Sequence, residues 1–223
     1  MILVLGGQKG GVGKSTIATS MVAELLQRKL TVLLVDADEQ GTANTWVQVA
    51  KTAEHPVPKF LQLSEDNLHK KLGPASSKVD HTIIDLPSRL GPRQRSALAV
   101  ADAVLLPCGP SAADMWALTE SVEMVTSARK VRPDLRAFVF VNRTQKHTTA
   151  GRTLRDDLRK WGLEVLYSQL SQRVAYRDAL AAGLGVTTIS GAPDAKTEML
   201  NLVDEILNRM KPKDDDDGEE EVD

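Results

Sequence analysis

Residues 6–16, which read GGQKGGVGKST, constrain the fold of this 223-residue chain more than any other stretch. They follow the apolar run ILVL at residues 2–5 and precede residues 17–27, where apolar side chains recur at helical spacing. A strand, a glycine-rich loop and a helix in this order direct backbone N–H groups at one point, which predicts an anion site. The loop departs from the phosphate-loop pattern G-x-x-x-x-G-K-[ST], because Gln8 replaces its first glycine, and it has a second lysine, Lys9.

The rest of the chain alternates between apolar runs and helix-like stretches. Further buried strands are predicted at residues 31–38 and 81–87, from 103, from 136 and a few residues before Arg173, and helices at about 42–53, 64–72, 92–101, 112–130, 148–161 and 194–210. Runs that are apolar throughout are typical of strands covered on both faces. We therefore expect an α/β fold, a doubly wound, mostly parallel sheet with helices on both faces, of the P-loop NTPase type.

The loop residues suit a nucleoside triphosphate. Glycines at 10, 11 and 13 allow the backbone to approach phosphates closely. Lys14 is expected to neutralise the β and γ phosphates, Ser15 to ligate Mg²⁺ and Thr16 to reach the α phosphate. The predicted loop set for ATP and Mg²⁺ is Gly10, Gly11, Val12, Gly13, Lys14, Ser15 and Thr16. The plainer alternative is a glycine-rich turn with incidental lysines.

Acidic residues follow two of the predicted strands. Asp85 ends the run TIID and fits the carboxylate that holds Mg²⁺, often through water. Asp36 and Asp38 end the neighbouring run, and a carboxylate there could orient the attacking water or assist the metal. We expect one of this pair to be functional and the other to support it by closing a turn. Asp38 lies further beyond the strand, so we assign the water to Asp38 and give Asp36 a place beside the metal.

Five stretches, in family order, resemble the ParA/MinD group of deviant Walker ATPases, most closely its short ParA-like partition and cargo-positioning proteins. They are QKGGVGKST, VDADEQG, TIIDLPSRLG, PCGPSAADMWAL and FVFVNRT, and the resemblance runs from residue 1 to about 190. It implies that Lys9 reaches across a homodimer interface to phosphates held by the other subunit, so that two ATP molecules lie between two chains. A second cation there would stabilise charge that develops during phosphoryl transfer, as an arginine finger does.

The resemblance implies further properties. Asn142 and Arg143 would lie around the adenine, and residues 110–114 would border the pocket and the interface. Hydrolysis would be slow until a ParB-like or other adaptor stimulates it. The ATP dimer would bind DNA without sequence preference and position a plasmid, a chromosome region or a protein assembly, in the cytoplasm and on the nucleoid. Two alternatives lack a DNA role, a regulatory adaptor switched by ATP and an assembly ATPase of this fold, although cluster carriers of that kind use several cysteines and Cys108 is single.

This chain departs from the family pattern in three places. Glu39 stands where members often have proline in D-x-D-P-Q, which adds a charge beside the strand end. The chain starts at its first strand, so we expect no N-terminal operator-binding domain. Its end is acidic, whereas MinD-like proteins end in a basic amphipathic helix, so we expect no membrane surface as partner.

Charge is unevenly distributed along the chain. Residues 214–223 hold eight of the 30 acidic residues and no basic one, so the rest carries 28 − 22 = +6. We expect one ATPase domain at residues 1–210 and a disordered acidic tail at 211–223. The positive domain suits contact with DNA phosphates. The candidate DNA-binding residues are Arg152, Arg155, Arg159, Lys160, Arg173 and Arg177. The open alternative for residues 151–162 is an ordinary solvated helix in which Asp156 and Asp157 balance the arginines.

Overall fold

The strand before the glycine-rich loop, β1 (Ile2–Leu5), lies at the centre of a seven-stranded sheet. The computed structural model describes residues 1–144, 156, 158–159 and 162–211. The strand order is β3-β2-β4-β1-β5-β6-β7 and every pairing is parallel. The other strands are β2 (Val32–Asp36), β3 (Lys59–Gln62), β4 (His81–Asp85), β5 (Ala103–Cys108), β6 (Arg136–Thr144) and β7 (Glu164–Ser171). The predicted doubly wound parallel sheet is therefore confirmed.

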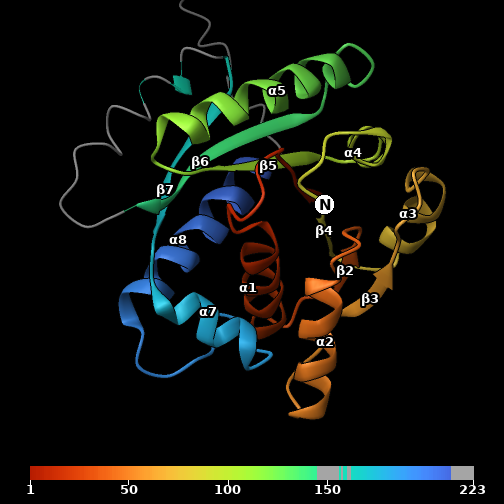
Figure 1. Cartoon of the computed structure of the whole chain (residues 1–223). Helices are drawn as coiled ribbons and strands as arrows, with labels where there is room; N and C mark the ends of the chain where they lie inside the picture. Colours follow the sequence, from red (N-terminus) through yellow and green to blue (C-terminus); the bar gives the residue numbers. More distant parts are fainter. Residues whose placement is uncertain (145–155, 157, 160–161, 212–223) are drawn as a thin grey trace, which may run out of the picture.

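Helices cover both faces of this sheet (Figure 1). On one face lie α1 (Lys14–Gln27), α2 (Thr42–Thr52), α7 (Val174–Ala181) and α8 (Pro193–Met210). On the other lie α3 (His69–Ser76), α4 (Pro92–Leu98) and α5 (Ala112–Arg129). Successive strand residues point to opposite faces, so in β1 Leu3 and Leu5 join the first core while Val4 joins the second. This explains why the strand runs are apolar throughout.

Two elements escaped the sequence prediction. β3 is a four-residue edge strand with two exposed and two half-buried residues, so it lacks the apolar run that marks the buried strands. α7 has only eight residues, too few for a clear helical period. The predicted helix at 148–161 lies mostly outside the described residues, as does the acidic tail apart from Lys211.

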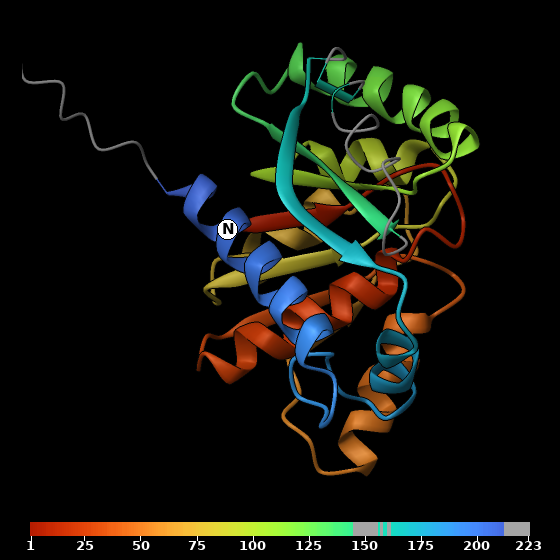
Figure 2. The same cartoon turned by 90° about the vertical axis from the view of Figure 1, so that its left-hand side faces the viewer.

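Helix α8 protects the second edge of the sheet. Figure 2 views the molecule from this side and shows α8 beside β7. The Glu205 carboxylate accepts the backbone N–H groups of Tyr167 and Ser168, each at 2.8 Å. Burial acts to raise the pKa of Glu205, but these N–H donors and Arg209 outweigh it, so the pKa is lowered. The edge strand thus obtains acceptors from a side chain in place of a further strand.

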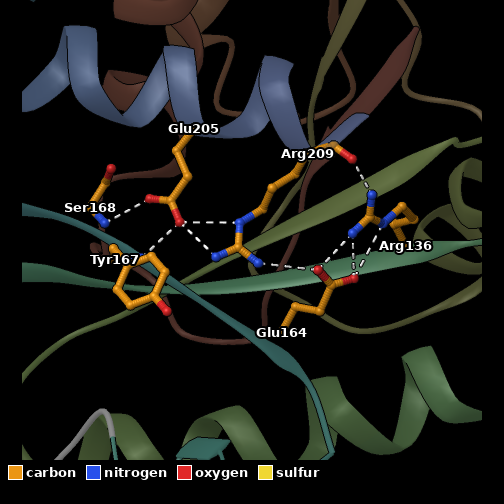
Figure 3. Close-up of polar contacts among 6 residues, drawn as sticks. All are labelled: Arg136, Glu164, Tyr167, Ser168, Glu205 and Arg209. Carbon is orange, nitrogen blue, oxygen red and sulfur yellow. Dashed lines mark hydrogen bonds and ion pairs between the residues drawn. The ribbon is translucent and has the colours of Figure 1, made fainter. Parts of the chain in front are cut away.

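The same cluster continues to the amino ends of β6 and β7 (Figure 3). Arg209 pairs with Glu205 at 2.9 Å and with Glu164 at 3.3 Å. Glu164 also pairs with Arg136 at 2.6 Å, and Arg136 donates to the carbonyl of Arg209. Each charged group in this cluster has a partner of opposite charge, which indicates a structural role.

Candidate nucleotide-binding site

The functional residues predicted from sequence gather where the parallel strands end. Asp36 of β2 is paired in register with Asp85 of β4, next to β1 and the glycine-rich loop. In open α/β sheets this carboxyl edge is where ligands bind. Residues from three separate stretches therefore meet at one place.

The glycine-rich loop is held in place by Asn142 at the end of β6. Its side-chain amide donates to the carbonyl oxygen of Val12 at 2.6 Å, and it is buried. Gly13 has a φ of 97°, and a Cβ there would lie 2.9 Å from the Asn142 nitrogen. Glycine is required at this position for both reasons. Asn142, which the family resemblance places around the adenine, thus also shapes the phosphate loop.

Lys14 starts α1 and is buried beneath the loop. Its Nζ donates to Ser88 Oγ at 2.8 Å and to the carbonyl oxygen of Lys9 at 3.2 Å. Burial lowers its pKa, although Asp85 and Asp38 oppose the shift. A buried ammonium held only by neutral acceptors lacks a close anion, and a phosphate would supply one.

Asp85 is the least satisfied polar group at this edge. It is fully buried, and neither carboxylate oxygen has a hydrogen-bond partner. Burial raises its pKa to about 7, reinforced by Asp36 and Asp38, while the nearby Ser15 hydroxyl and Lys14 act in the opposite direction. An unpartnered buried carboxylate beside a serine hydroxyl fits Mg²⁺, which binds through few protein oxygens and retains several waters. No cluster of three or more histidine, cysteine or acidic ligands occurs among the described residues, and Mg²⁺ with phosphates needs none.

The neighbouring pair of aspartates has two different environments. Asp36 is buried, and its two oxygens accept the backbone N–H groups of Asp38 at 3.0 Å and Asn44 at 2.8 Å. Asp36 therefore organises the loop and the start of α2. Asp38 is half-buried, and its Oδ1 accepts the N–H of Gln40 at 3.0 Å. Asp38 therefore lies beyond the strand end and is more exposed than Asp36.

Lys9 forms an ion pair within its own chain. Its Nζ lies 2.5 Å from Oδ1 of Asp114, near the start of α5, and its side chain is 40% exposed. Asp114 also forms a capping box with Ser111. Burial acts to raise the pKa of Asp114, but Lys9 and Ser111 outweigh it and lower the pKa. For Lys9 to reach a second subunit, this ion pair must first open.

A cavity of about 610 Å³ adjoins the loop near the ends of β6 and β7. Gly13, Thr16, Asn142 and Arg143 line it on the loop side. The end of β7, the turn after it and the start of α7 also line it, with Gln172, Arg173, Val174, Tyr176 and Arg177. This volume suits a small molecule such as a nucleoside.

The six candidate DNA-binding residues differ in what the structure shows of them. Arg152, Arg155 and Lys160 lie outside the described residues. Arg159 is exposed and pairs weakly with Asp156 at 3.3 Å, and Arg177 is exposed at the cavity rim.

Arg173 is engaged within the chain. It pairs with Glu198 at 2.7 Å and with Asp194 at 3.0 Å, both in α8, so it supports the cavity wall. We do not keep it among the DNA candidates.

Sequence reasoning missed two residues that the structure brings to this edge. Ser88 accepts a hydrogen bond from Lys14, and Arg93 contacts the loop that carries Asp38. Both depend on pairings between distant parts of the chain. Asp114, which binds Lys9, lies in the stretch 110–114 that the resemblance places at the pocket, but its pairing with Lys9 was not predicted.

A glycine loop between the central strand of a parallel sheet and a helix, with a buried lysine and carboxylate beside it, defines a P-loop nucleotide-binding protein. The chain belongs to the CobQ/CobB/MinD/ParA nucleotide-binding domain family, whose model matches residues 3–186. This confirms the resemblance to the ParA/MinD group. ATPases occur in this family, and one member has been solved with ATP.

Individual relatives refine this placement. The chain is 33% identical over 212 residues to maintenance of carboxysome distribution protein A of Halothiobacillus neapolitanus, covering 94% of this chain and 96% of the relative. It is 29% identical over 176 residues to the chromosome partitioning protein ParA of Myxococcus xanthus, covering 60% and 62%. The Cyanothece McdA(D38A)–ATP complex has the same fold, with a TM-score of 0.75, 19% identity, and coverage of 93% and 96%. No described helix is long and apolar enough to cross a membrane.

Proposed function

We propose that this chain is a Mg²⁺-dependent ATPase that forms a homodimer around ATP and positions a cargo. The observation that carries the enzymatic part is Asp85, a buried carboxylate without a hydrogen-bond partner, at the same edge as the buried ammonium of Lys14, with which it forms no ion pair. These two groups have opposite ligand needs, a cation and an anion. Magnesium with a polyphosphate meets both.

Each residue at the edge then has a role in binding or hydrolysis. Lys14 and the N–H groups of the loop bind the phosphates, and Ser15 and Asp85 hold Mg²⁺, with Asp36 supporting them. The bound metal would neutralise charge on the phosphate oxygens. Asp38 orients the attacking water, and Lys9 acts in the partner's site after leaving Asp114.

The cavity beside the loop receives the nucleoside. Asn142 and Arg143 line it where the loop ends, so the base would lie between β6 and the β7–α7 turn. The turn is held by Arg173 and its two carboxylate partners in α8. This arrangement supports the adenine role that the family resemblance gives to Asn142 and Arg143.

The cargo-positioning part is supported by the relatives, which are named for carboxysome distribution and chromosome partitioning. We propose that the ATP dimer binds nucleoid DNA without sequence preference in the cytoplasm. A ParB-like or other adaptor stimulates hydrolysis and releases it. Arg152, Arg155, Arg159, Lys160 and Arg177 are the proposed phosphate contacts.

DNA retention tests this model. Full-length protein is mixed with non-specific duplex DNA and Mg²⁺ plus ATP, ADP or no nucleotide, at 50 and 200 mM salt, and binding is followed by fluorescence anisotropy. We expect the protein to bind DNA with ATP but not with ADP or without nucleotide. The affinity for DNA should fall by about tenfold or more at the higher salt. The matched variants are Arg152→Glu/Arg155→Glu/Arg159→Glu, which should abolish retention, and Lys70→Glu on α3, which should not.

Two outcomes would redirect the proposal. Binding of ATP with no salt-sensitive DNA binding would favour the ATP-switched regulatory adaptor. DNA binding that is independent of nucleotide would contradict a cycle driven by hydrolysis.

A further inference from the structure

Arg93, in the first turn of α4, reaches across to the loop that carries Asp38. Its Nη1 donates to the carbonyl oxygen of Ala37 at 2.9 Å, and its side chain is only 15% exposed. Ala37 itself is fully buried, so its carbonyl depends on a protein donor. Arg93 thus hydrogen-bonds the backbone immediately before Asp38.

This contact fixes the peptide unit that presents Asp38. That unit consists of the Ala37 carbonyl, which Arg93 holds, and the Asp38 N–H, which donates to Asp36 Oδ1 at 3.0 Å. One residue earlier, the N–H of Ala37 donates to the carbonyl oxygen of Asp85 at 2.9 Å. Rotation of the backbone at Asp38 would break at least one of these bonds.

Arg93 makes further contacts on the same side. Its Nη2 lies 3.1 Å from Glu39 Oε1 and also contacts the carbonyl oxygen of Ser64, while its Nε lies 3.9 Å from Asp66. The Glu39 side chain is 75% exposed, so this ion pair adds little energy. The two backbone carbonyls therefore account for most of the anchoring. A guanidinium serves several acceptors at once, which a lysine cannot do with the same geometry.

The next residue on α4 connects this anchor to the phosphate loop. Gln94 is fully buried and donates to the carbonyl oxygens of Pro87 at 2.9 Å and Arg89 at 3.3 Å. Between them lies Ser88, the acceptor of Lys14. The first turn of α4 thus holds both the segment that touches Lys14 and the loop that carries Asp38.

We infer that Arg93 is a positioning residue for ATP hydrolysis, which keeps Asp38 where it can orient the attacking water. This inference rests on the proposed ATPase function. Arg93 acts through the backbone of Ala37 and does not line the nucleoside cavity. Its removal should therefore slow the chemical step and leave nucleotide binding intact.

Single-turnover hydrolysis and nucleotide affinity, measured on the full chain, separate these effects. For Arg93→Gln we expect the hydrolysis rate at saturating Mg²⁺-ATP to fall about tenfold to a hundredfold, since small misplacements of a catalytic group have effects of this size. The Kd for ATP should stay within twofold. Arg93→Lys should have the same pattern with a smaller loss. Arg95→Gln, an exposed arginine on the same helix, is the matched control and should hydrolyse ATP normally.

The outcomes are distinct. A rate for Arg93→Gln within threefold of wild type would overturn the inference, as would equal losses of rate and affinity, which mean a general structural role. If Arg93→Gln does not fold, Arg93→Lys decides: a rate lowered more than threefold at unchanged Kd supports positioning, and a smaller change refutes it. A wild-type chain that does not bind Mg²⁺-ATP would instead refute the proposed function.

Discussion

Two carboxylates near the amino ends of β6 and β7, and the Asp85 carboxylate at the carboxyl end of β4, lie in opposite environments. At the amino ends of β6 and β7, Glu164 and Glu205 are surrounded by arginines and backbone N–H donors (Figure 3). At the carboxyl ends, Asp85 is buried with no hydrogen bond to either oxygen. The first arrangement is complete within the chain and stabilises it. The second is stable only at a cost, which indicates that a ligand completes it.

The largest effect on nucleotide binding should come from removing the Lys14 ammonium at the carboxyl end of the sheet. Lys14→Ala should weaken Mg²⁺-ATP binding by about a hundredfold or more, because a buried charged partner of the phosphates is lost. Isothermal titration calorimetry measures this directly. Lys70→Ala, an exposed lysine on α3, is the control and should bind normally. Near-normal ATP affinity in Lys14→Ala would show that the phosphates do not bind in this loop.

Near the amino ends of β6 and β7, removal of a carboxylate should lower the stability of the fold and leave the affinity for ATP unchanged. Glu205→Ala leaves two edge N–H groups and Arg209 without this acceptor, so the free energy of unfolding should fall by about 2–3 kcal/mol. The Kd for ATP should not change. Urea denaturation measures the loss, and Glu65→Ala, in the exposed Lys71–Glu65 pair, should change stability by less than about 0.5 kcal/mol.

The sharpest contrast is neutralisation of Asp85, which should stabilise the protein without ligand. Its pKa in the folded protein, about 7, lies above the ordinary value of 3.8, so the folded state holds its proton more tightly than the unfolded state. Stability therefore falls as pH rises from about 4 to about 7, and the penalty is fully present above that range. In EDTA at pH 8, Asp85→Asn should be more stable than wild type by at least about 1 kcal/mol, and this gain should shrink as pH falls and be absent near pH 4.

The same substitution should remove the stabilisation that Mg²⁺-ATP gives to the wild-type protein. Thermal unfolding with and without Mg²⁺-ATP measures both effects. If Asp85→Asn is less stable than wild type at pH 8, the two ends of the sheet do not differ as we describe.

Local patterns predicted most of the nucleotide edge. The order of strand, glycine loop and helix is continuous in sequence, and Asp36 and Asp85 each end an apolar run, so topology alone brings them together. The side-chain pairs between distant parts of the chain could not be predicted. Lys9 and Asp114 are 105 residues apart, and nothing near either one indicates the other. Arg173 was assigned to DNA because basic residues cluster there in sequence, whereas its partners Asp194 and Glu198 lie on α8.

At the carboxyl end of the sheet, the second lysine of the glycine-rich loop, Lys9, already forms an ion pair with Asp114. For Lys9 to act across a dimer interface, ATP and a second subunit must replace this pair. Asp38→Ala should slow hydrolysis and accumulate the ATP-bound dimer, while Lys9→Ala should remove the contact between subunits without removing ATP from the loop.

Size-exclusion chromatography with light scattering on these variants is the most direct test of whether Lys9 acts across the interface. In Mg²⁺-ATP, the Asp38→Ala variant should have twice the monomer mass. The double variant Asp38→Ala/Lys9→Ala should have the monomer mass and still contain ATP. A double variant that dimerises as fully as Asp38→Ala would contradict the central claim that Lys9 acts across the interface.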